Sequence, residues 1–326
     1  MGLRSNRLVV GCAILGAVGT WVQTAEAQGW PTRNITAIIP FAAGNANDLT
    51  GRILLDQVGK QLGQTIVIEN RAGAGGTIGV AAAARATPDG YTVLFHSASF
   101  SAAYVTHKSL PYDTLADFTA VSPGGIQPSV LVVGPSKGFK TAAELIAAAK
   151  AKPGAMNYAS AGIGAASHLA AEKFRLAAGI AAQHIPFKGP VEALTEVMAG
   201  RIDFYFLPIS PALPLIKEGK VIALAVSSGK RAPLLPDVPT TAEIGLPNAA
   251  YAFWNGMFVP AKTPRDIVDR LYSETQKALQ DASVKERLAK LGVEPLAMTQ
   301  PEFERYFKAD VADTEKLAKQ AGIEKN

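Results

Sequence analysis

Residues 34–62 read NITAIIPFAAGNANDLTGRILLDQVGKQL, a short apolar run followed by a loop of small residues and then a helical pattern. The apolar run spans residues 34–40, and apolar residues recur at helical spacing over 47–62, before Gly63. A continuous apolar strand that leads into a helix is typical of an open parallel sheet covered on both faces. The stretch therefore predicts one strand–loop–helix unit, with its loop at the carboxyl end of the strand.

The same alternation continues along the chain and predicts the α/β fold class. Further strands are predicted over 65–69, 91–95, 130–133, 156–159, 183–186, 202–207 and 221–226. Further helices are predicted from an alanine-rich segment through Arg85, over 141–150 with Thr141 as N-cap, over 165–178 and 191–199, and in the tail, with Pro264 and Pro301 at helix starts. Residues 231–247 hold four prolines and are predicted to form a surface connection.

The length of the chain predicts two domains. It has 326 residues, of which 48% are hydrophobic, and a typical domain has roughly 100–200 residues. The alternation restarts near residue 130, so two α/β lobes joined by hinge strands fit the order of elements. A chain of this size can bury a sufficient core without disulfide or metal staples.

The N-terminus has the order of residues that marks a secretory signal. Two arginines precede an apolar run over 8–22, and residues 25–27 read AEA, a cleavage site. We predict a signal peptide over residues 1–27 and a periplasmic location. Cys12, the only cysteine, lies inside this segment, so the exported chain has no thiol for catalysis, metal ligation or disulfides. Lipidation of Cys12 is an alternative that the short apolar stretch before it disfavours.

Charge and motif content exclude several function classes. The net charge is only +5, with both signs interspersed, and no nucleic-acid surface is predicted. The four histidines form no H-x-x-x-H pair, and no G-x-S-x-G elbow occurs. Residues 73–79 (GAGGTIG) follow a strand as a dinucleotide loop would, but Ile78 stands where the third glycine belongs, which favours a tight turn. An exported NAD-type oxidoreductase that uses this loop is kept as an alternative.

Three strand-to-helix loops have a composition suited to an anion, because helix N-termini present free N–H groups and a partial positive charge. Asn47 or Asp48 is also expected to cap the first helix. The candidate ligand-binding residues in these loops are Phe41, Ala42, Ala43, Gly44, Asn45, Asn47, Asp48, Ser97, Ser99, Ser160, Gly162, Gly164, Ala165 and His168. For His168, support of the site is favoured over proton transfer.

Further candidates lie outside these loops. Lys188 is considered for an anion contact, with a solvated surface lysine as the favoured alternative. Asp203 is a candidate, although the acids are too dispersed to argue a carboxylate pair. Apolar side chains expected at the far end of a cleft are Phe100, Phe187, Leu207 and Trp254. No cofactor and no metal are predicted.

Several stretches together resemble a known family, the Bug-type extracytoplasmic solute receptors of tripartite tricarboxylate transporters. They are residues 30–31 and 39–44 with Asp48, residues 69–79 (ENRAGAGGTIG), residues 88–92 (PDGYT), and residues 157–160 with 168–169. Weaker similarities are residues 110–113, 236–240, and 254 with 260–261. The chain departs from the family pattern at Asn45, where a second glycine is usual, and at Ala165, where a serine or threonine is usual.

The resemblance implies a two-lobed periplasmic-binding-protein (Venus flytrap) fold, type II-like, without catalysis. We place lobe 1 at residues 28–125 plus 251–326 and lobe 2 at 126–250. In the family, a ligand carboxylate is held by amides and waters from two facing loops, which correspond here to residues 41–48 and 160–165. The implied partners are a small mono-, di- or tricarboxylate, aromatic acids included, and two integral membrane transporter subunits, and the chain is expected to be a monomer. Delivery of the ligand to a membrane sensor kinase or chemoreceptor is the alternative role.

Overall fold

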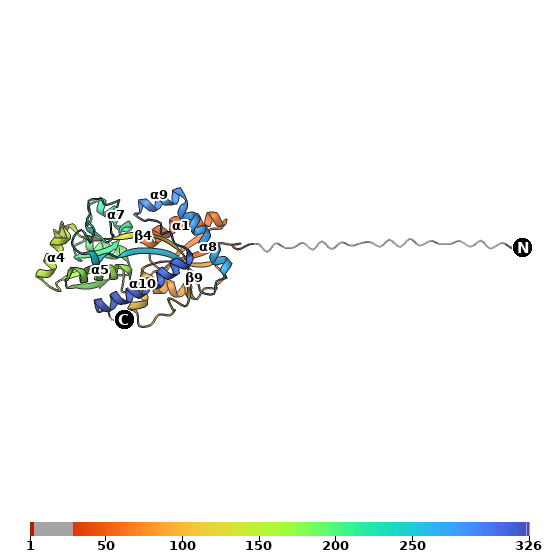
Figure 1. Cartoon of the computed structure of the whole chain (residues 1–326), viewed down its shortest axis with the longest axis horizontal. Helices are drawn as coiled ribbons and strands as arrows, with labels where there is room; N and C mark the ends of the chain where they lie inside the picture. The colour runs from red at the N-terminus through yellow and green to blue at the C-terminus, as the bar shows by residue number, and fades with distance from the viewer. Residues whose placement is uncertain (3–28, 324, 326) are drawn as a thin grey trace. The chain divides into compact units, whose positions relative to one another are not determined.

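Two long strands connect the two halves of the folded body. β4 (Phe118–Val133) pairs antiparallel with β9 (Ala252–Pro260) along residues 118–128, and its residues 129–133 pair with two strands of the other half. Figure 1 shows both strands extending from the half that carries α1 and α8 toward the half that carries α4 and α5. We call the first half lobe 1 and the second half lobe 2.

The computed structural model describes residues 1–2, 29–323 and 325, and one compact body spans residues 31–326. Cys12 and almost all of the predicted signal peptide lie outside the described residues, so cleavage after residue 27 stays a prediction. In the described part of the chain, no helix is both long enough and apolar enough to cross a membrane.

Lobe 1 is built around β1 (Ile35–Ile39), which lies between β2 (Ile66–Asn70) and β3 (Thr92–Ser97) and is parallel to both. β3 pairs antiparallel with β9, which pairs with β4. The helices of this lobe are α1 (Ala46–Leu62), α2 (Thr77–Ala84), α3 (Ser99–Thr106), α8 (Arg265–Gln280), α9 (Ala282–Lys290) and α10 (Gln300–Ala321), with a 3-10 turn, η1 (Ala74–Gly76). α10 also packs against α5 of lobe 2.

Lobe 2 repeats this plan. β5 (Met156–Ser160) lies between β6 (Ala182–Pro186) and β7 (Phe204–Pro208), parallel to both, while β7 and β8 (Ile222–Val226) pair antiparallel with β4. Its helices are α4 (Ala142–Ala151), α5 (Ala166–Ala178), α6 (Pro190–Met198) and α7 (Ile209–Lys217), with 3-10 turns η2 (Pro135–Lys137) and η3 (Pro247–Ala249). The α/β class with parallel strands is confirmed, and the antiparallel pairs occur at the connecting strands.

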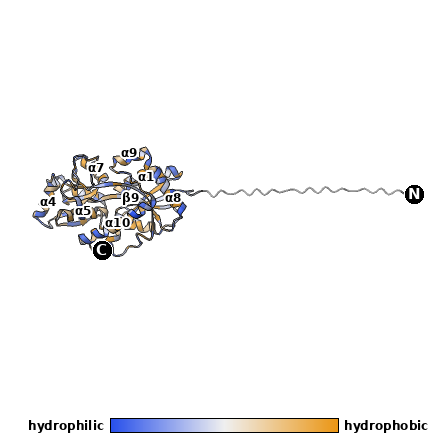
Figure 2. Ribbon diagram, viewed as in Figure 1, coloured by the Kyte–Doolittle hydropathy of each residue, from blue (hydrophilic) through white to orange (hydrophobic). Residues whose placement is uncertain are grey.

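Each lobe has its own core, and the cores meet at Ala166 and Tyr251. In lobe 1, Phe100 is fully buried at the centre of an aromatic cluster, with ring centroids 5.0 Å from His96 and 5.1 Å from both Phe258 and Phe307. In lobe 2, apolar clusters cover both faces of the sheet. Figure 2 shows hydrophilic residues on the outer turns of helices such as α9 and α10. Because Phe100 is fully buried in the aromatic cluster of lobe 1, it belongs to the core and not, as predicted, to a cleft wall.

Four elements were not predicted from the sequence: α3, α7, β9 and residues 118–129 of β4. Pro211 and Pro214 lie in α7, and prolines lower the expectation of a helix. β4 contains Pro123 and two register shifts, which break the apolar pattern, so only its last four residues were recognised. Among the predicted helix starts, Thr141 caps α4 in a capping box with Glu144, as expected.

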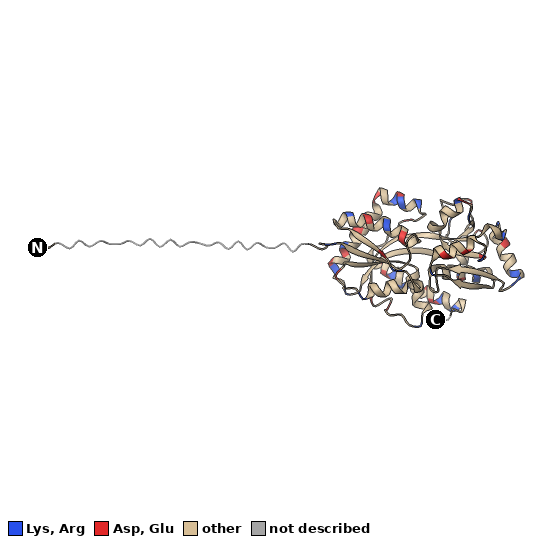
Figure 3. Ribbon diagram, turned by 180° about the vertical axis from the view of Figure 1, so that it is seen from behind, with Lys and Arg blue, Asp and Glu red and all other residues tan. Residues whose placement is uncertain are grey.

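Charged residues of both signs are mixed on the helices in Figure 3. Many of them form ion pairs one helical turn apart, such as Arg265 with Asp269 on α8 and Lys308 with Glu304 on α10. Such exposed pairs contribute only about 0.3–0.5 kcal/mol each. The stability of the fold therefore rests on the buried clusters.

Replacing Phe100 with leucine is expected to lower the free energy of unfolding by about 1–3 kcal/mol, because aromatic contacts are lost and a cavity remains. Ligand affinity is expected to stay within about twofold of the parent, since the ring lies in the core. Urea unfolding and calorimetric titration measure the two quantities. A large loss of affinity at unchanged stability would contradict the core assignment.

Candidate functional site

Five of the described helices begin at one cavity between the lobes, which has a volume of about 40 Å³. They follow the carboxyl ends of β1, β3, β5, β6 and β7 along the chain. The lining residues at these helix starts are 45–47 of α1, Ser97 and Ser99 at α3, 165–167 of α5, Pro190 of α6 and Pro208 at α7. Because helix N-termini carry a partial positive charge, their convergence favours a negatively charged ligand.

The loop before α1 is shaped by Gly44 and Asn45. Gly44 takes the left-handed φ of +81°, while Asn45 is extended and is the N-cap of α1. The Asn45 side-chain oxygen accepts hydrogen bonds from the amides of Asn47 (2.8 Å) and Asp48 (3.2 Å). The prediction that Asn47 or Asp48 caps the helix is wrong, because Asn45 supplies the acceptor. Ala46, the first residue of the helix, lines the cavity.

Asp48 fixes the conformation of this loop from outside the cavity lining. Its carboxylate accepts hydrogen bonds from the Gly44 amide (2.9 Å), from Nε of Arg52 (2.9 Å) and from the Asn70 side chain (3.0 Å). Burial alone raises the pKa of Asp48, but the hydrogen bonds from Arg52, Gly44 and Asn70 outweigh burial, so the pKa is lowered from its usual value. Asp48 is therefore ionised at neutral pH and is saturated with protein donors, which makes it a loop organiser.

The loop before α5 has a different cap. Ala165 is the N-cap and offers no side-chain acceptor, so the first amides of α5 are not satisfied by their own cap. The Ala166 amide donates to Oγ of Ser99 in lobe 1 (2.9 Å), a hydrogen bond that joins the lobes inside the cavity wall. Ser167 Oγ accepts from the Ala161 amide (3.0 Å) and braces the loop. The N-terminus of α5 therefore faces lobe 1 directly.

A stack of neutral rings supports this second loop. Oγ of Ser160 lies 2.6 Å from Nε2 of His184, whose ring stacks on His168 with centroids 3.9 Å apart. Burial and the Arg175 cation lower the pKa of His168 to about 4, and burial together with His168 lowers the pKa of His184 to about 3. Both rings are therefore neutral at neutral pH. His168 supports the loop through this stack and does not line the cavity.

The remaining walls of the cavity are apolar or neutral. Phe41 and Phe253 from lobe 1 face Tyr205 and Pro211 from lobe 2, and no Lys, Arg, His, Asp or Glu belongs to the described lining. Burial raises the pKa of Tyr205, so its hydroxyl stays protonated. Among the described residues, no group of three or more His, Cys, Asp or Glu is placed to hold a metal ion. An anion in this cavity would meet neutral donors only.

The structure brings together many of the candidates named from the sequence. Those that line the cavity are Phe41, Asn45, Asn47, Ser97, Ser99 and Ala165. Those in the same two loops but outside the lining are Ala42, Ala43, Gly44, Ser160, Gly162 and Gly164. Two loops that are far apart in the sequence thus border one cavity.

The other candidates lie elsewhere, and their predicted positions are corrected. Leu207 and Trp254 are fully buried in the cores of lobe 2 and lobe 1, and Phe187 packs against the lobe 2 core. Asp203 accepts a hydrogen bond from Lys137 Nζ (2.6 Å) just before β7 begins, at the opposite end of that strand from Pro208. Lys188 is exposed. Only Asp203 lies at the amino end of its strand; Leu207 and Phe187 lie at carboxyl ends of β7 and β6, but their side chains pack into the lobe 2 core.

Four further lining residues, Ala46, Ala161, Ala166 and Ser167, lie in or directly after the two loops expected from the sequence. Sequence reasoning missed the remaining lining residues, which are Pro190, Tyr205, Pro208, Pro211 and Phe253. Pro190 follows β6 at the start of α6, Pro208 ends β7 and Pro211 lies in α7. The rule applied to the first three loops would have found Pro190 directly, and Pro208 and Pro211 once α7 was recognised. Phe253 lies on β9, for which no strand was predicted.

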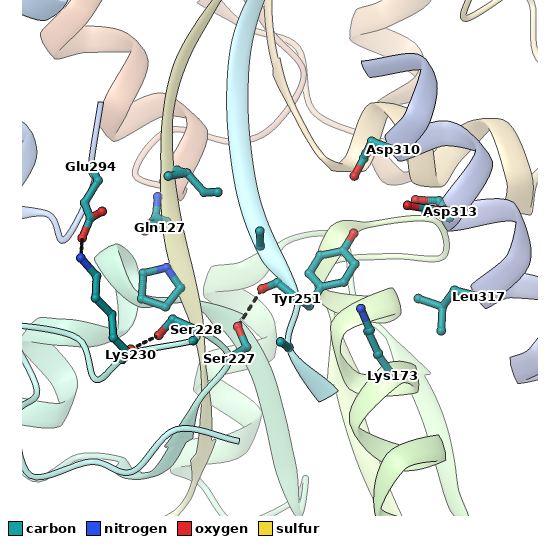
Figure 4. Close-up of a pocket in the computed structure, with 16 residues that line it drawn as sticks. Gln127, Lys173, Ser227, Ser228, Lys230, Tyr251, Glu294, Asp310, Asp313 and Leu317 are labelled. Carbon is teal, nitrogen blue, oxygen red and sulfur yellow. Dashed lines mark hydrogen bonds and ion pairs between the residues drawn. The ribbon is translucent and has the colours of Figure 1, made fainter. Parts of the chain in front are cut away.

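A larger groove of about 800 Å³ lies at the connecting strands, away from the helix starts (Figure 4). Figure 4 shows Lys173 of α5 rising toward Asp310 and Asp313 of α10, with Tyr251 beside them. Burial raises the pKa of Asp310 to about 6. An anion in this groove would meet three acids, Glu294, Asp310 and Asp313. Of the two lysines in the lining, Lys230 pairs with Glu294 (3.2 Å) and Lys173 faces the other two acids. The smaller cavity is the better candidate for ligand binding.

A two-lobed α/β fold with a cavity where strand ends of both lobes meet is shared with periplasmic solute-binding proteins, of which BugD is an example. The family model described as "Tripartite tricarboxylate transporter family receptor" matches residues 50–323, and the chain belongs to this family. The resemblance inferred from the sequence is confirmed. The family and its structural relatives are binding proteins, so the chain is a receptor and not an oxidoreductase or other enzyme.

Solved structures of similar proteins share the fold. The periplasmic binding protein BugD is 35% identical with a TM-score of 0.86, over 91% of this chain and 100% of that chain. The R. palustris protein Rpa4515 with adipate is 31% identical with a TM-score of 0.88, over 91% and 100%. MatC (Rpa3494) from Rhodopseudomonas palustris with bound malate is 30% identical with a TM-score of 0.83, over 88% and 99%. The two-lobed fold class is confirmed by these structures.

Replacing Asp48 with asparagine is expected to lower the free energy of unfolding by roughly 2 kcal/mol at pH 7, because hydrogen bonds to an ionised buried carboxylate are lost. The pKa of Asp48 is lower in the folded state, so this stabilisation is present above about pH 4 and is lost as pH falls further. The difference between parent and variant should therefore shrink from pH 5 to pH 3 in urea unfolding. Asp56→Asn on the exposed side of α1 is the matched control, with an expected change of a few tenths of a kcal/mol. Equal effects of the two substitutions would contradict the role of Asp48.

Proposed function

We propose that this receptor captures a small carboxylate between its lobes in the periplasm and delivers it to a tripartite tricarboxylate-type membrane transporter. The observation that carries this proposal is the convergence of five helix N-termini, from both lobes, on a cavity whose described lining has no charged side chain. Such a site has donors and partial positive charge but no fixed counter-ion, which suits an anion that must be released again.

The carboxylate grip would use main-chain donors from two loops. The amides of Ala42, Ala43 and Ala46 would supply it from lobe 1 and those of Ile163, Gly164 and Ser167 from lobe 2, because the other amides of residues 42–46 and 161–167 already donate within the protein. The hydroxyls of Ser97 and Ser99 lie at the same cavity. A charge-assisted hydrogen bond contributes roughly 1.5–3 kcal/mol. A few such bonds reach a micromolar complex, about −8 kcal/mol.

The ligand class follows from the walls and from the relatives. Aromatic and proline side chains, among them Phe41, Phe253 and Pro211, line the part of the cavity beyond the helix starts and suit a hydrocarbon body. Rpa4515 is seen with adipate and MatC with malate, both dicarboxylates. Mono-, di- and tricarboxylates, aromatic acids included, are the proposed ligands.

Binding requires the lobes to move. The ligand would enter the open form, and because a cavity of about 40 Å³ holds only a few waters, lining side chains such as Phe41 and Phe253 would shift to admit a four- or six-carbon acid when the lobes close again. β4 and β9 connect the lobes, so opening and closing would bend these strands. Two integral membrane subunits would then recognise and bind the closed form of the receptor. We propose that the receptor acts as a monomer.

The proposed location rests on two observations. The N-terminal segment has the composition of a secretory signal, and BugD, which shares the fold at 35% identity, is a periplasmic binding protein. A receptor that delivers solute to a membrane transporter must meet its ligand outside the cytoplasmic membrane.

Calorimetric titration against adipate, malate, citrate and benzoate, each paired with its amide, tests whether the site recognises a carboxylate group. At least one acid is expected to bind with a Kd near the micromolar range, and its amide at least about tenfold more weakly, because the amide loses the charge that the helix N-termini stabilise. Equal binding of an acid and its amide, or no binding of any acid, would remove the proposed function.

The affinity for a fully ionised acid is expected to change less than twofold between pH 6 and pH 8. The reason is that the described lining has no group that titrates in this range, and the pKa values of His168 and His184 beneath the loop are about 4 and about 3. Titrations at pH 6, 7 and 8 measure this. A steady loss of affinity with rising pH would instead indicate a histidine-based grip.

A further inference from the structure

The glycine run at residues 73–76, which the function above leaves without a role, lies where the lobes touch. Gly75 in η1 has a φ of +65°. A Cβ atom placed on Gly75 would lie 2.5 Å from the carbonyl oxygen of Ile163 in lobe 2. Cβ atoms essentially never approach another atom more closely than 3.0 Å. The two main chains therefore meet at a distance that only glycine permits.

The lobe 2 side of this contact is also made of glycines. Gly162 packs on Gly75 itself, because a Cβ on Gly162 would lie 3.5 Å from the Cα atom of Gly75. Gly164 faces α3 of lobe 1, and a Cβ there would collide with Oγ1 of Thr106 and lie 3.1 Å from the His107 ring. The hydrogen bond from the Ala166 amide to Ser99 lies next to this contact. Main chain meets main chain at this edge of the cavity.

The lobe 1 loop at residues 73–79 is closely packed and cannot shift easily. A Cβ on Gly79 would lie 2.8 Å from both the Arg71 carbonyl oxygen and Pro40. A Cβ on Gly76 would lie 3.3 Å from the ring of Phe41, which lines the cavity. The loop is thus packed against the strand end and the cavity wall behind it. An added methyl group at position 75 would push the lobes apart rather than displace the loop.

We propose that Gly75 is the closure contact of the receptor, the point against which lobe 2 comes to rest when the lobes close. This rests on the proposed function, in which the loops of both lobes must reach the same carboxylate. The absence of a side chain at position 75 sets how closely residues 161–167 approach residues 42–46, and so sets ligand affinity. Gly75 is a positioning residue, since it does not line the cavity.

The test compares Gly75→Ala with Gly63→Ala. Gly63 ends α1 with φ +68° and ψ +19°, close to the +65° and +13° of Gly75, but a Cβ at position 63 would have no atom within 4 Å. Both alanines therefore carry the same left-handed backbone strain. Only the alanine at position 75 also meets the other lobe. Comparing the two variants therefore separates the effect of the contact between the lobes from the effect of backbone strain.

Two measurements are made on the purified proteins. Calorimetric titration with adipate and with malate is expected to show a Kd at least tenfold higher for Gly75→Ala and within twofold of the parent for Gly63→Ala. Hydrogen exchange without ligand is expected to be faster in the peptide covering residues 161–166 of Gly75→Ala only. Thermal unfolding should shift by similar amounts in both variants.

The outcomes distinguish this inference from the proposed function. Equal changes of Kd in the two variants, or exchange at residues 161–166 that is the same in Gly75→Ala as in the parent, would overturn the closure contact. If the parent binds no acid at all, the proposed function fails, and the exchange comparison still decides whether Gly75 and Ile163 hold the lobes together.

Discussion

The structure depends on one constraint, the pairing of β4 with β9 along residues 118–128. These strands join two sheets of similar plan, and in each sheet the central strand is parallel to its neighbours. Parallel strands deliver all their carboxyl ends to one edge, and helices begin there. Because β4 continues from one sheet into the other, those edges face each other, and helix N-termini of both lobes converge on one cavity.

This arrangement explains how a site without charged side chains can attract an anion. Partial charges and free N–H groups at helix starts act together when five of them meet, and each contributes a small amount. A lysine or arginine in the lining would bind more tightly but would also carry its own desolvation cost and slow release. The residues that hold the two loops in place, Asp48, His168 and His184, lie outside the cavity lining. Asp48 is saturated by protein donors, and the His168–His184 stack is neutral.

The proposed closure of the lobes introduces a second requirement, close approach of main chains. Ser99 of lobe 1 accepts a hydrogen bond from the Ala166 amide, and Gly75 meets Ile163 nearby. Contacts of this kind cannot be recognised from composition, because a glycine run before a helix is equally compatible with a tight turn or a phosphate loop. The run at residues 73–79 resembles a dinucleotide loop for that reason. Its partner in space is the lobe 2 loop at Ile163.

Apolar periodicity and loop composition by themselves determined the α/β class, the order of most strands and helices, and the two loops that border the cavity. Those features are local, since a strand, its following loop and the helix start lie within about twenty residues of each other. Only the tertiary structure decided that Leu207 and Trp254 are core residues and that Tyr205 and Phe253 are walls. It also placed Gly75 against Ile163. These assignments depend on which strand end faces which lobe, and that geometry is set by the long-range pairing of β4 with β9, which no local pattern records.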